Sequence, residues 1–274
     1  MSDRRTPRFH RLLRRLPVSL PALILAACGA LPERRELPRP PVDLDAVPDA
    51  QPRPEPLSRY GNPPFYVVEG RRYELLRDGR GYVERGIASW YGGDFHGRRT
   101  SSGETYDMYR MTAAHRVLPI PCYVEVLNLD NGRRAVLRVN DRGPFKDNRI
   151  IDLSYVAARK LGIWARGTGL VEVRVIDPAR PGHRPGPAPA TRVAALSPLP
   201  FFVQVGAFFD RANAERLGER VRQVAKDVRV SPGESNGLAV YRVQIGPLTS
   251  VERSDGIVQA LSRIGVIDHR IVLD

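Results

Sequence analysis

The chain has 274 residues, of which 42% are hydrophobic and 27% are charged, and its formal net charge is +13. Residues 1–27 contribute +5 of this charge, which leaves +8 for residues 28–274. A basic surface suits an anionic cell envelope and a nucleic acid equally well. Charge alone therefore excludes neither class of partner, and the choice depends on signals along the chain.

The N-terminus resembles an export signal. An apolar run of 12 residues, Leu16–Ala27, follows a basic segment that contains Arg4, Arg5, Arg8, Arg11, Arg14 and Arg15. A membrane-spanning helix needs roughly 20 residues, so this run is too short to cross a bilayer. The arrangement is typical of a secretory signal peptide, which we assign to residues 1–27. Because the protein is then exported, we expect no nucleic-acid partner.

A lipid anchor is predicted at the end of this signal. Residues 25–29 read Leu-Ala-Ala-Cys-Gly and resemble a bacterial lipobox, in which Cys28 becomes the acylated N-terminal residue. The alternative is an ordinary signal peptide with an incidental cysteine. Gly29 stands where an aspartate would signal inner-membrane retention, and by similarity to sorted lipoproteins this favours the outer membrane. We expect a lipid-anchored envelope protein that faces the periplasm.

The second cysteine, Cys122, would then have no cysteine partner, so no intrachain disulfide is expected. It lies in an alternating, strand-like run at residues 121–126. This setting favours a small buried core residue over a reactive nucleophile.

Two proline-rich segments divide the chain. Residues 28–59 are predicted to form an extended tether and residues 178–199 a linker, because their composition cannot bury a core. After an N-terminal extension at residues 60–81, this division predicts two small domains, at residues 82–177 and 200–274.

The first domain is expected to be mainly β. Asn131-Gly132 predicts a hairpin turn between two strands, and Ser154 and Gly162 are suited to begin and end a helix over residues 154–161. Strands are predicted by β-branched and aromatic content at residues 86–92, 123–129, 134–139 and 170–176, with a small hairpin at 65–75. Short strands with one helix and no alternating βαβ order favour a compact barrel.

Candidate catalytic side chains come from three separate segments. Asp141 follows an apolar strand and precedes a turn made by Gly143 and Pro144, which would hold its carboxylate rigidly. Upstream polar segments supply further candidates: Glu104, Asp107 and His115. Each of the four residues can instead have an ordinary structural role. Asp141 can cap its own turn, Glu104 can be an exposed turn residue, Asp107 a local cap, and His115 a core histidine satisfied by the backbone.

Seven runs between residues 86 and 155 carry a resemblance to the rare lipoprotein A family: Gly86–Gly92, Phe95–Gly97, Thr100–Met108, Met111–His115, Leu118–Pro121, Val139–Phe145 and Ile151–Tyr155. The resemblance implies a double-psi β-barrel and septal lytic transglycosylase activity on peptidoglycan. The functional positions of the family fall on Glu104, Asp107, His115 and Asp141. It also implies no cofactor or metal, and it raises divisome proteins as candidate partners.

The implied reaction cleaves the bond between N-acetylmuramic acid (MurNAc) and N-acetylglucosamine (GlcNAc) without water and forms a 1,6-anhydro ring. We predict Asp141 as the lone acid/base, which must start protonated. Glu104 and Asp107 would stabilise charge or orient sugar hydroxyls, and His115 would hydrogen-bond substrate or Asp141. Substrate contacts are expected from Trp90 and Tyr91 by stacking, and from Arg142, which is also a structural partner of the turn.

The C-terminal domain contains an internal repeat. Phe202–Phe208 matches Tyr241–Leu248, and a helical pattern follows each strand. The repeat resembles the SPOR domain, a βαββαβ unit with a four-stranded sheet and two helices. The resemblance implies binding to glycan strands stripped of peptides, with Phe202, Gln204, Tyr241 and Gln244 as candidate contacts. Odd and even strand positions face opposite ways, so these four cannot all face glycan.

Three functions fit these residues and motifs. The first is a septal lytic transglycosylase, the second a glycan-binding lipoprotein that does not cut, and the third an inverting hydrolase that pairs Asp141 with Glu104 or Asp107. The products of digested glycan distinguish them: anhydro ends, no cleavage, or reducing ends.

Overall fold

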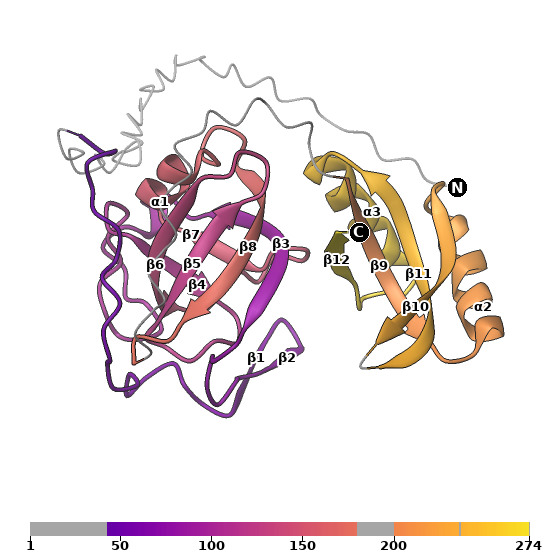
Figure 1. Ribbon diagram of the computed structural model, residues 1–274, viewed down its shortest axis with the longest axis horizontal. Helices are drawn as coiled ribbons and strands as arrows, with labels where there is room; N and C mark the ends of the chain where they lie inside the picture. Colours follow the sequence, from indigo (N-terminus) through magenta and orange to yellow (C-terminus); the bar gives the residue numbers. More distant parts are fainter. Residues whose placement is uncertain (1–42, 180–199, 236, 274) are drawn as a thin grey trace, which may run out of the picture. The chain divides into compact units, whose positions relative to one another are not determined.

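The computed structural model describes residues 43–179, 200–235 and 237–273 of the chain (Figure 1). The predicted signal peptide, the predicted lipidation site at Cys28 and residues 180–199 of the predicted linker lie outside these ranges. Among the helices that are described, none has both the length and the apolar character needed to cross a membrane.

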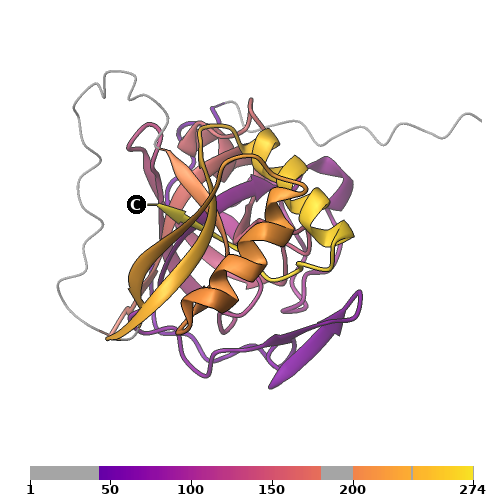
Figure 2. The same cartoon turned by 90° about the vertical axis from the view of Figure 1, so that its right-hand side faces the viewer.

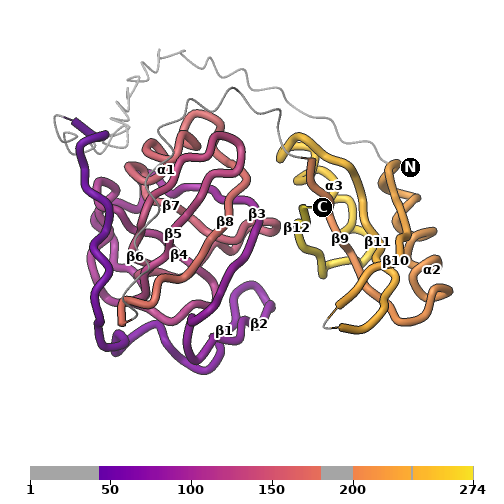
Figure 3. The backbone as a smooth tube through the Cα atoms, viewed as in Figure 1, coloured from indigo at the N-terminus to yellow at the C-terminus, as the bar shows by residue number. Residues whose placement is uncertain are grey.

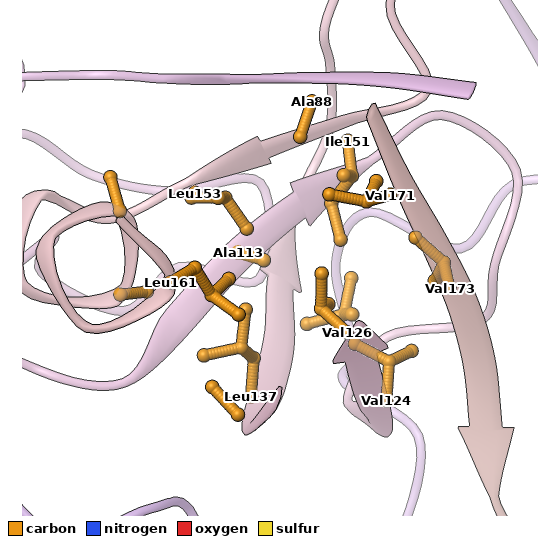
Figure 4. Packing of buried hydrophobic residues seen from close by; sticks show 14 of the residues in the cluster. Ala88, Ala113, Val124, Val126, Leu137, Ile151, Leu153, Leu161, Val171 and Val173 are labelled. Atoms are coloured by element: carbon orange, nitrogen blue, oxygen red, sulfur yellow. The ribbon is translucent and has the colours of Figure 1, made fainter. Parts of the chain in front are cut away.

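The first domain is a closed six-stranded barrel with strand order β3-β7-β4-β6-β5-β8 (Figure 1), which confirms the predicted barrel. The strands are β3 (Val83–Trp90), β4 (Thr112–His115), β5 (Cys122–Asn128), β6 (Arg134–Asp141), β7 (Ile151–Leu153) and β8 (Thr168–Ile176). Branched and small apolar side chains fill the interior (Figure 4). Ala113, Ile151 and Leu153 are fully buried there, which fixes the inward face of the two shortest strands.

The turn and capping residues that were predicted from the sequence are found in those roles. β5 and β6 form an antiparallel hairpin around Asn131-Gly132, where Gly132 has φ 71°. Helix α1 (Tyr155–Leu161) begins after Ser154, whose hydroxyl accepts a hydrogen bond from the backbone N–H of Ala157. It ends at Gly162, which adopts the left-handed conformation with φ 74°.

Strands β4 and β7 were not predicted as strands, because three or four residues are too few for a periodic pattern. Their pairing completes the barrel. β4 runs parallel to β6 and antiparallel to β7, and β3 runs parallel to β7. The register of β4 against β6 shifts at Asn140, so that Ala113 pairs with Val139 and Ala114 with Asp141. This irregularity sets the position of the last residue of β6.

Residues 43–62, most of which fall in the predicted tether, lie along the barrel, as the indigo part of the tube in Figure 3 shows. The backbone N–H of Ala50 donates to the carbonyl of Val136 at 3.0 Å, and that of Ser58 to the carbonyl of Ile120 at 3.0 Å. A two-stranded hairpin follows, β1 (Phe65–Val68) and β2 (Arg71–Glu74), as predicted for residues 65–75. A short 3-10 turn, η1 (Gly93–Phe95), follows β3.

The second domain has a four-stranded antiparallel sheet in the order β10-β11-β9-β12 and two helices, as predicted (Figures 1 and 2). Its elements are β9 (Phe201–Phe208), α2 (Arg211–Arg222), β10 (Val228–Ser235), β11 (Leu238–Leu248), α3 (Val251–Arg263) and β12 (Arg270–Leu273). Phe201, Val203 and Val205 of β9 belong to the buried core, together with residues of both helices. Phe202 and Gln204 therefore face away from the helices, whereas after a shift in register Gly206 and Phe208 face α2 and the core.

Candidate active site

Asp141, the last residue of β6, is held by neutral hydrogen-bond donors. Its Oδ1 accepts from the backbone N–H of Ser101 at 2.7 Å, the hydroxyl of Ser101 at 2.7 Å and the backbone N–H of Arg142 at 2.8 Å. Oδ2 of Asp141 receives no hydrogen bond in the described part of the chain. One carboxylate oxygen is thus fixed, and the other remains available for a reacting group.

Asp141 is one end of a row of four residues on adjacent strands. Ser89 of β3 pairs with Asp152 of β7, Asp152 pairs with Ala114 of β4, and Ala114 pairs with Asp141 of β6. We call these four residues the Asp141–Asp152 row. The neighbours of Ala114 and Asp152 along their strands point into the core, so the row faces the outside of the barrel.

Asp152 is the second carboxyl of this row, and it is half-buried. The Ser89 hydroxyl donates to its Oδ1 at 2.5 Å. A β-carbon placed on Gly143 would lie 3.9 Å from Oδ2 of Asp152, so this oxygen faces the turn that follows Asp141. Burial raises the pKa of Asp152; the Ser89 hydrogen bond and the charges of Arg149 and Arg116 oppose the rise, and the charge of Asp141 adds to it.

Glu104 lies in a different electrostatic setting. Its two carboxylate oxygens accept from Nη1 of Arg138 at 2.8 and 2.9 Å, and Oε2 also accepts from the side-chain amide of Asn140 at 2.8 Å. Arg138 binds a second carboxylate, Glu55, through Nε at 3.1 Å and Nη2 at 2.9 Å. We call Glu55, Glu104, Arg138 and Asn140 the Arg138 cluster. Its guanidinium compensates two carboxylate charges.

The pKa values within the Arg138 cluster follow from these contacts. Burial alone would lower the pKa of Arg138, but its hydrogen bonds with Glu55 and Glu104 outweigh burial and raise the pKa overall. The hydrogen bonds from Arg138 lower the pKa of Glu55 to about 2. Glu55 and Arg138 therefore remain charged at neutral pH.

A single loop joins the row and the cluster. Residues Thr100–Glu104 place Ser101 on Asp141 and Glu104 on Arg138, and the backbone N–H of Ser102 donates to the carbonyl of Asn140. Gly103 makes the turn possible with φ 88°. The loop explains why residues 100–104 occur as one sequence motif.

A cavity of about 340 Å³ adjoins the Arg138 cluster. Glu104, Asp107 and Tyr109 line it on the barrel side, and residues 47–51 close it from the N-terminal segment. The carboxylate of Asp107 accepts a hydrogen bond from the backbone N–H of Tyr109 at 3.0 Å, so it caps its own turn while facing this cavity.

His115 does not join Asp141. It is 1% exposed, and its Nδ1 accepts from the backbone N–H groups of Val117 and Leu118 at 3.3 and 3.1 Å. The proton is therefore on Nε2, which lies 3.0 Å from the Tyr82 hydroxyl. Burial lowers the pKa of His115 to about 3, and the charges of Arg116 and Arg142 add to the effect. The alternative in which His115 hydrogen-bonds Asp141 is wrong, because the ring is held largely by backbone N–H groups, and the contact with substrate stays a prediction.

Arg142 is also occupied by the fold. Its guanidinium donates to the backbone carbonyls of Gly61 at 2.8 Å, His115 at 3.0 Å and Leu118 at 2.5 Å, and to Oδ1 of Asn62 at 3.2 Å. These four bonds tie the turn after β6 to two other segments. They agree with the expected structural role of Arg142 and leave its guanidinium poorly suited to bind substrate.

The two predicted stacking residues are half-buried. Trp90 packs against the barrel core, and its ring centroid lies 5.7 Å from that of Tyr155. Tyr91 stacks on Tyr106 with a centroid distance of 4.1 Å, and the Tyr106 hydroxyl donates to the carbonyl of Tyr91. The charges of Asp141 and Asp152 both raise the pKa of Tyr91, after the larger effect of burial, which places this ring beside the row.

Three of the four candidate residues of the second domain share one face of its sheet. Gln204 pairs with Gln244, and Phe202 lies two residues before Gln204 on the same side, opposite the helices. Tyr241 instead packs against the core on the helix side. Gln244 accepts a hydrogen bond from Nε of Arg229 at 2.9 Å, and the guanidinium of Arg229 lies 3.7 Å from the Phe202 ring centroid.

Cys122 is half-buried and forms no disulfide within the described residues, and burial raises the pKa of its thiol to about 12. This agrees with the predicted unreactive role. In the described part of the chain, no group of three or more His, Cys, Asp or Glu side chains is arranged to hold a metal ion.

Sequence reasoning missed Ser89, Ser101, Arg138 and Asp152 as site residues. Three of them lie inside the runs that carried the family resemblance, namely Ser89, Ser101 and Asp152. Their presence in these runs was a usable signal, but their partners lie on other strands and could not be paired from the sequence.

Comparison with known proteins agrees with this architecture. A family described as "Lytic transglycolase" matches residues 83–175, and the SPOR domain family matches residues 197–267. The protein named endolytic peptidoglycan transglycosylase RlpA of Vibrio cholerae is 38% identical over 248 residues, which cover 89% of this chain and 90% of that protein. The protein of the same name from Neisseria meningitidis serogroup B is 42% identical, with 69% of this chain and 75% of that protein covered. The crystal structure of the RlpA SPOR domain from Pseudomonas aeruginosa is 24% identical and covers 27% of this chain and 99% of that domain, with a TM-score of 0.26.

Proposed function

Because the chain belongs to the RlpA family of endolytic peptidoglycan transglycosylases, we propose that it cleaves the MurNAc–GlcNAc bond of peptide-free peptidoglycan strands. The products are 1,6-anhydro-MurNAc ends, and the site of action is the division septum. The enzyme is a peptidoglycan lytic transglycosylase, and its SPOR domain binds peptidoglycan.

The observation that carries the proposal is the setting of Asp141. Three neutral donors fix Oδ1, no cation of the described chain forms an ion pair with the carboxylate, and Oδ2 is left available. A group that must change its charge during a reaction is best held in this way, because a bound guanidinium would hold it in one charge state.

In the reaction, Asp141 starts protonated and gives its proton to the glycosidic oxygen, and the ring oxygen and C1 of MurNAc develop positive charge as the bond to the departing GlcNAc breaks. The C6 hydroxyl of the same MurNAc then attacks C1, and its proton passes to Oδ2 of Asp141. Asp107, Glu104 and the cavity beside them supply polar contacts to a neighbouring sugar. Tyr91, beside the row, offers an aromatic face to the glycan.

The N-terminal lipid anchor and the SPOR domain determine where the protein acts. Acylation of Cys28 anchors the protein to the envelope, at the outer membrane and facing the periplasm. The SPOR domain selects glycan stripped of peptides, through the sheet face that carries Phe202, Gln204 and Gln244. Septal enrichment follows if such glycan is concentrated where the wall is being divided, and divisome proteins are then neighbours.

Mass spectrometry of digested peptide-free glycan tests the proposal. The purified protein should release fragments that are lighter by one water than hydrolysis products, which is the mark of an anhydro ring. Reducing ends in place of anhydro ends would identify a hydrolase. Intact strands that remain bound to the protein would identify a binding lipoprotein.

A further inference from the structure

The two carboxyls of the Asp141–Asp152 row lie in opposite environments. Asp141 receives three hydrogen bonds from N–H and O–H donors, whereas Asp152 receives one, from Ser89, and burial raises its pKa. Hydrogen bonds to a carboxylate favour its charged form, and burial favours its neutral form. Where two neighbouring acids are treated so differently, the environments themselves assign the roles of base and acid.

Both carboxyls lie on the same face of the barrel wall. Asp141 and Asp152 flank Ala114 in register, so their Cα atoms are two strand spacings apart, about 10 Å. The methyl group of Ala114 lies between them, and a β-carbon on Gly143 would lie 3.9 Å from both this methyl group and Oδ2 of Asp152. A side chain at position 143 would therefore occupy space beside both groups.

We propose that Asp152 is a second catalytic carboxyl, which protonates the glycosidic oxygen, while Asp141 takes the proton of the C6 hydroxyl. The inference rests on the proposed transglycosylase function and replaces its lone acid/base with a pair.

The reaction breaks one bond at C1 and forms another. The C1–O4 bond breaks, its electron pair leaves with O4, and O4 takes the proton of Asp152. O6 then bonds to C1, and its proton moves to Asp141. The enzyme is left with Asp152 ionised and Asp141 protonated, and exchange with water returns the proton to Asp152.

Several polar and charged groups surround Asp152. Ser89 of β3 donates to it, and Asp141 of β6 faces it across Ala114. Arg149, just before β7, and Arg116, just after β4, contribute positive charge. The Ser89 hydroxyl donates to Asp152, and the Ser101 hydroxyl donates to Asp141 while it also accepts from the backbone N–H of Arg142 at 3.2 Å. The two serines therefore offer matched single-atom changes, one at each carboxyl.

The pH profile of cleavage distinguishes the pair from a lone residue. Ser89→Ala removes a donor to ionised Asp152, so the alkaline limb of kcat/KM should move up by roughly 0.4 to 1 pH unit. Ser101→Ala removes a donor to Asp141 and not to Asp152, so it should lower kcat/KM and leave the alkaline limb in place. If Ser89→Ala leaves the alkaline limb unchanged, Asp141 acts alone and the inference is wrong.

Asp152→Asn provides the second test, because the amide oxygen can still accept the Ser89 hydrogen bond and the variant is isosteric. Cleavage of peptide-free glycan should fall by about 100-fold or more. A MurNAc glycoside with a nitrophenyl leaving group needs no proton to depart, so Asp152→Asn should retain activity on it and Asp141→Asn should not. Equal loss on both substrates would show a merely structural role.

Failure of the inference and failure of the proposed function give different results. If the wild-type protein releases no anhydro ends, the function itself is wrong. If the wild-type protein releases them and Asp152→Asn does so at the same rate, only the role of Asp152 is wrong.

Discussion

The Arg138 cluster and the Asp141–Asp152 row hold carboxylates in two different ways on one barrel. In the cluster, a guanidinium binds both Glu55 and Glu104, so every charge has an opposite charge within 3.1 Å. In the row, hydroxyls and backbone amides bind the carboxylates. An ion pair stabilises the ionised carboxylate with a full opposite charge, whereas neutral donors stabilise it through hydrogen bonds alone. The difference separates a part of the site that orients from a part that reacts.

The largest effect that this comparison predicts is the loss of cleavage in Asp141→Asn. The amide cannot accept the C6 hydroxyl proton, so cleavage should fall by about 100- to 10,000-fold. Release of anhydro fragments from peptide-free glycan measures the loss. Binding of the variant to the same glycan should be unchanged, because the SPOR domain does not use Asp141. A variant that still cleaves at the wild-type rate would contradict the assignment of the row as the reacting part.

Arg138→Gln tests the Arg138 cluster. The change leaves Glu55 and Glu104 without their cation, so the free energy of unfolding should fall by about 2 to 4 kcal/mol. Chemical denaturation at pH 7 measures this quantity. The pH limits of the cleavage that remains should match those of the wild type, because the row is unchanged. A shift of those limits would mean that the cluster takes part in proton transfer.

His115 predicts a pH dependence of stability. Its pKa in the folded protein is about 3, well below the value of about 6.5 for an unfolded histidine. The unfolded chain therefore binds the proton first, and stability present above pH 6.5 is lost as pH falls towards 3. The wild type should lose up to about 1.4 kcal/mol per pH unit from this residue.

His115→Asn provides the control for this dependence. The amide oxygen can accept the hydrogen bonds from Val117 and Leu118 and does not titrate in this range. Denaturation curves between pH 7 and pH 4 should therefore have a smaller pH slope in the variant than in the wild type. Equal slopes would contradict a neutral, buried His115.

The smallest effect is expected for Glu55→Gln, at the point where the N-terminal segment joins the Arg138 cluster. The Glu55 side chain is 16% exposed, so its ion pair is partly screened, and its loss should cost about 1 kcal/mol at pH 7. Its pKa is lowered to about 2, so this contribution is present above pH 4.5 and is lost as pH falls towards 2. Limited proteolysis of residues 43–62 should also become faster, and an unchanged rate would mean that other contacts hold the segment.

Local sequence signals were sufficient where neighbours in the chain interact. The β5–β6 hairpin needs only the turn at Asn131-Gly132, and α1 needs only Ser154 and Gly162, so both were predicted. The site was predictable in part. Asp141 was found because its turn is local, whereas the contact expected between His115 and Asp141 was wrong because the ring turns towards the core.

The sequence by itself determined the two domains, the turn that follows Asp141, and the family to which the motifs point. Only the tertiary structure decided which partner each carboxylate has. Ser101 is 40 residues from Asp141, Arg138 is 34 residues from Glu104, and Ser89 is 63 residues from Asp152. These partners meet because closing the barrel brings β4 and β7 between β3 and β6. Strands of three and four residues have no periodicity of their own, and their register exists only in the closed sheet.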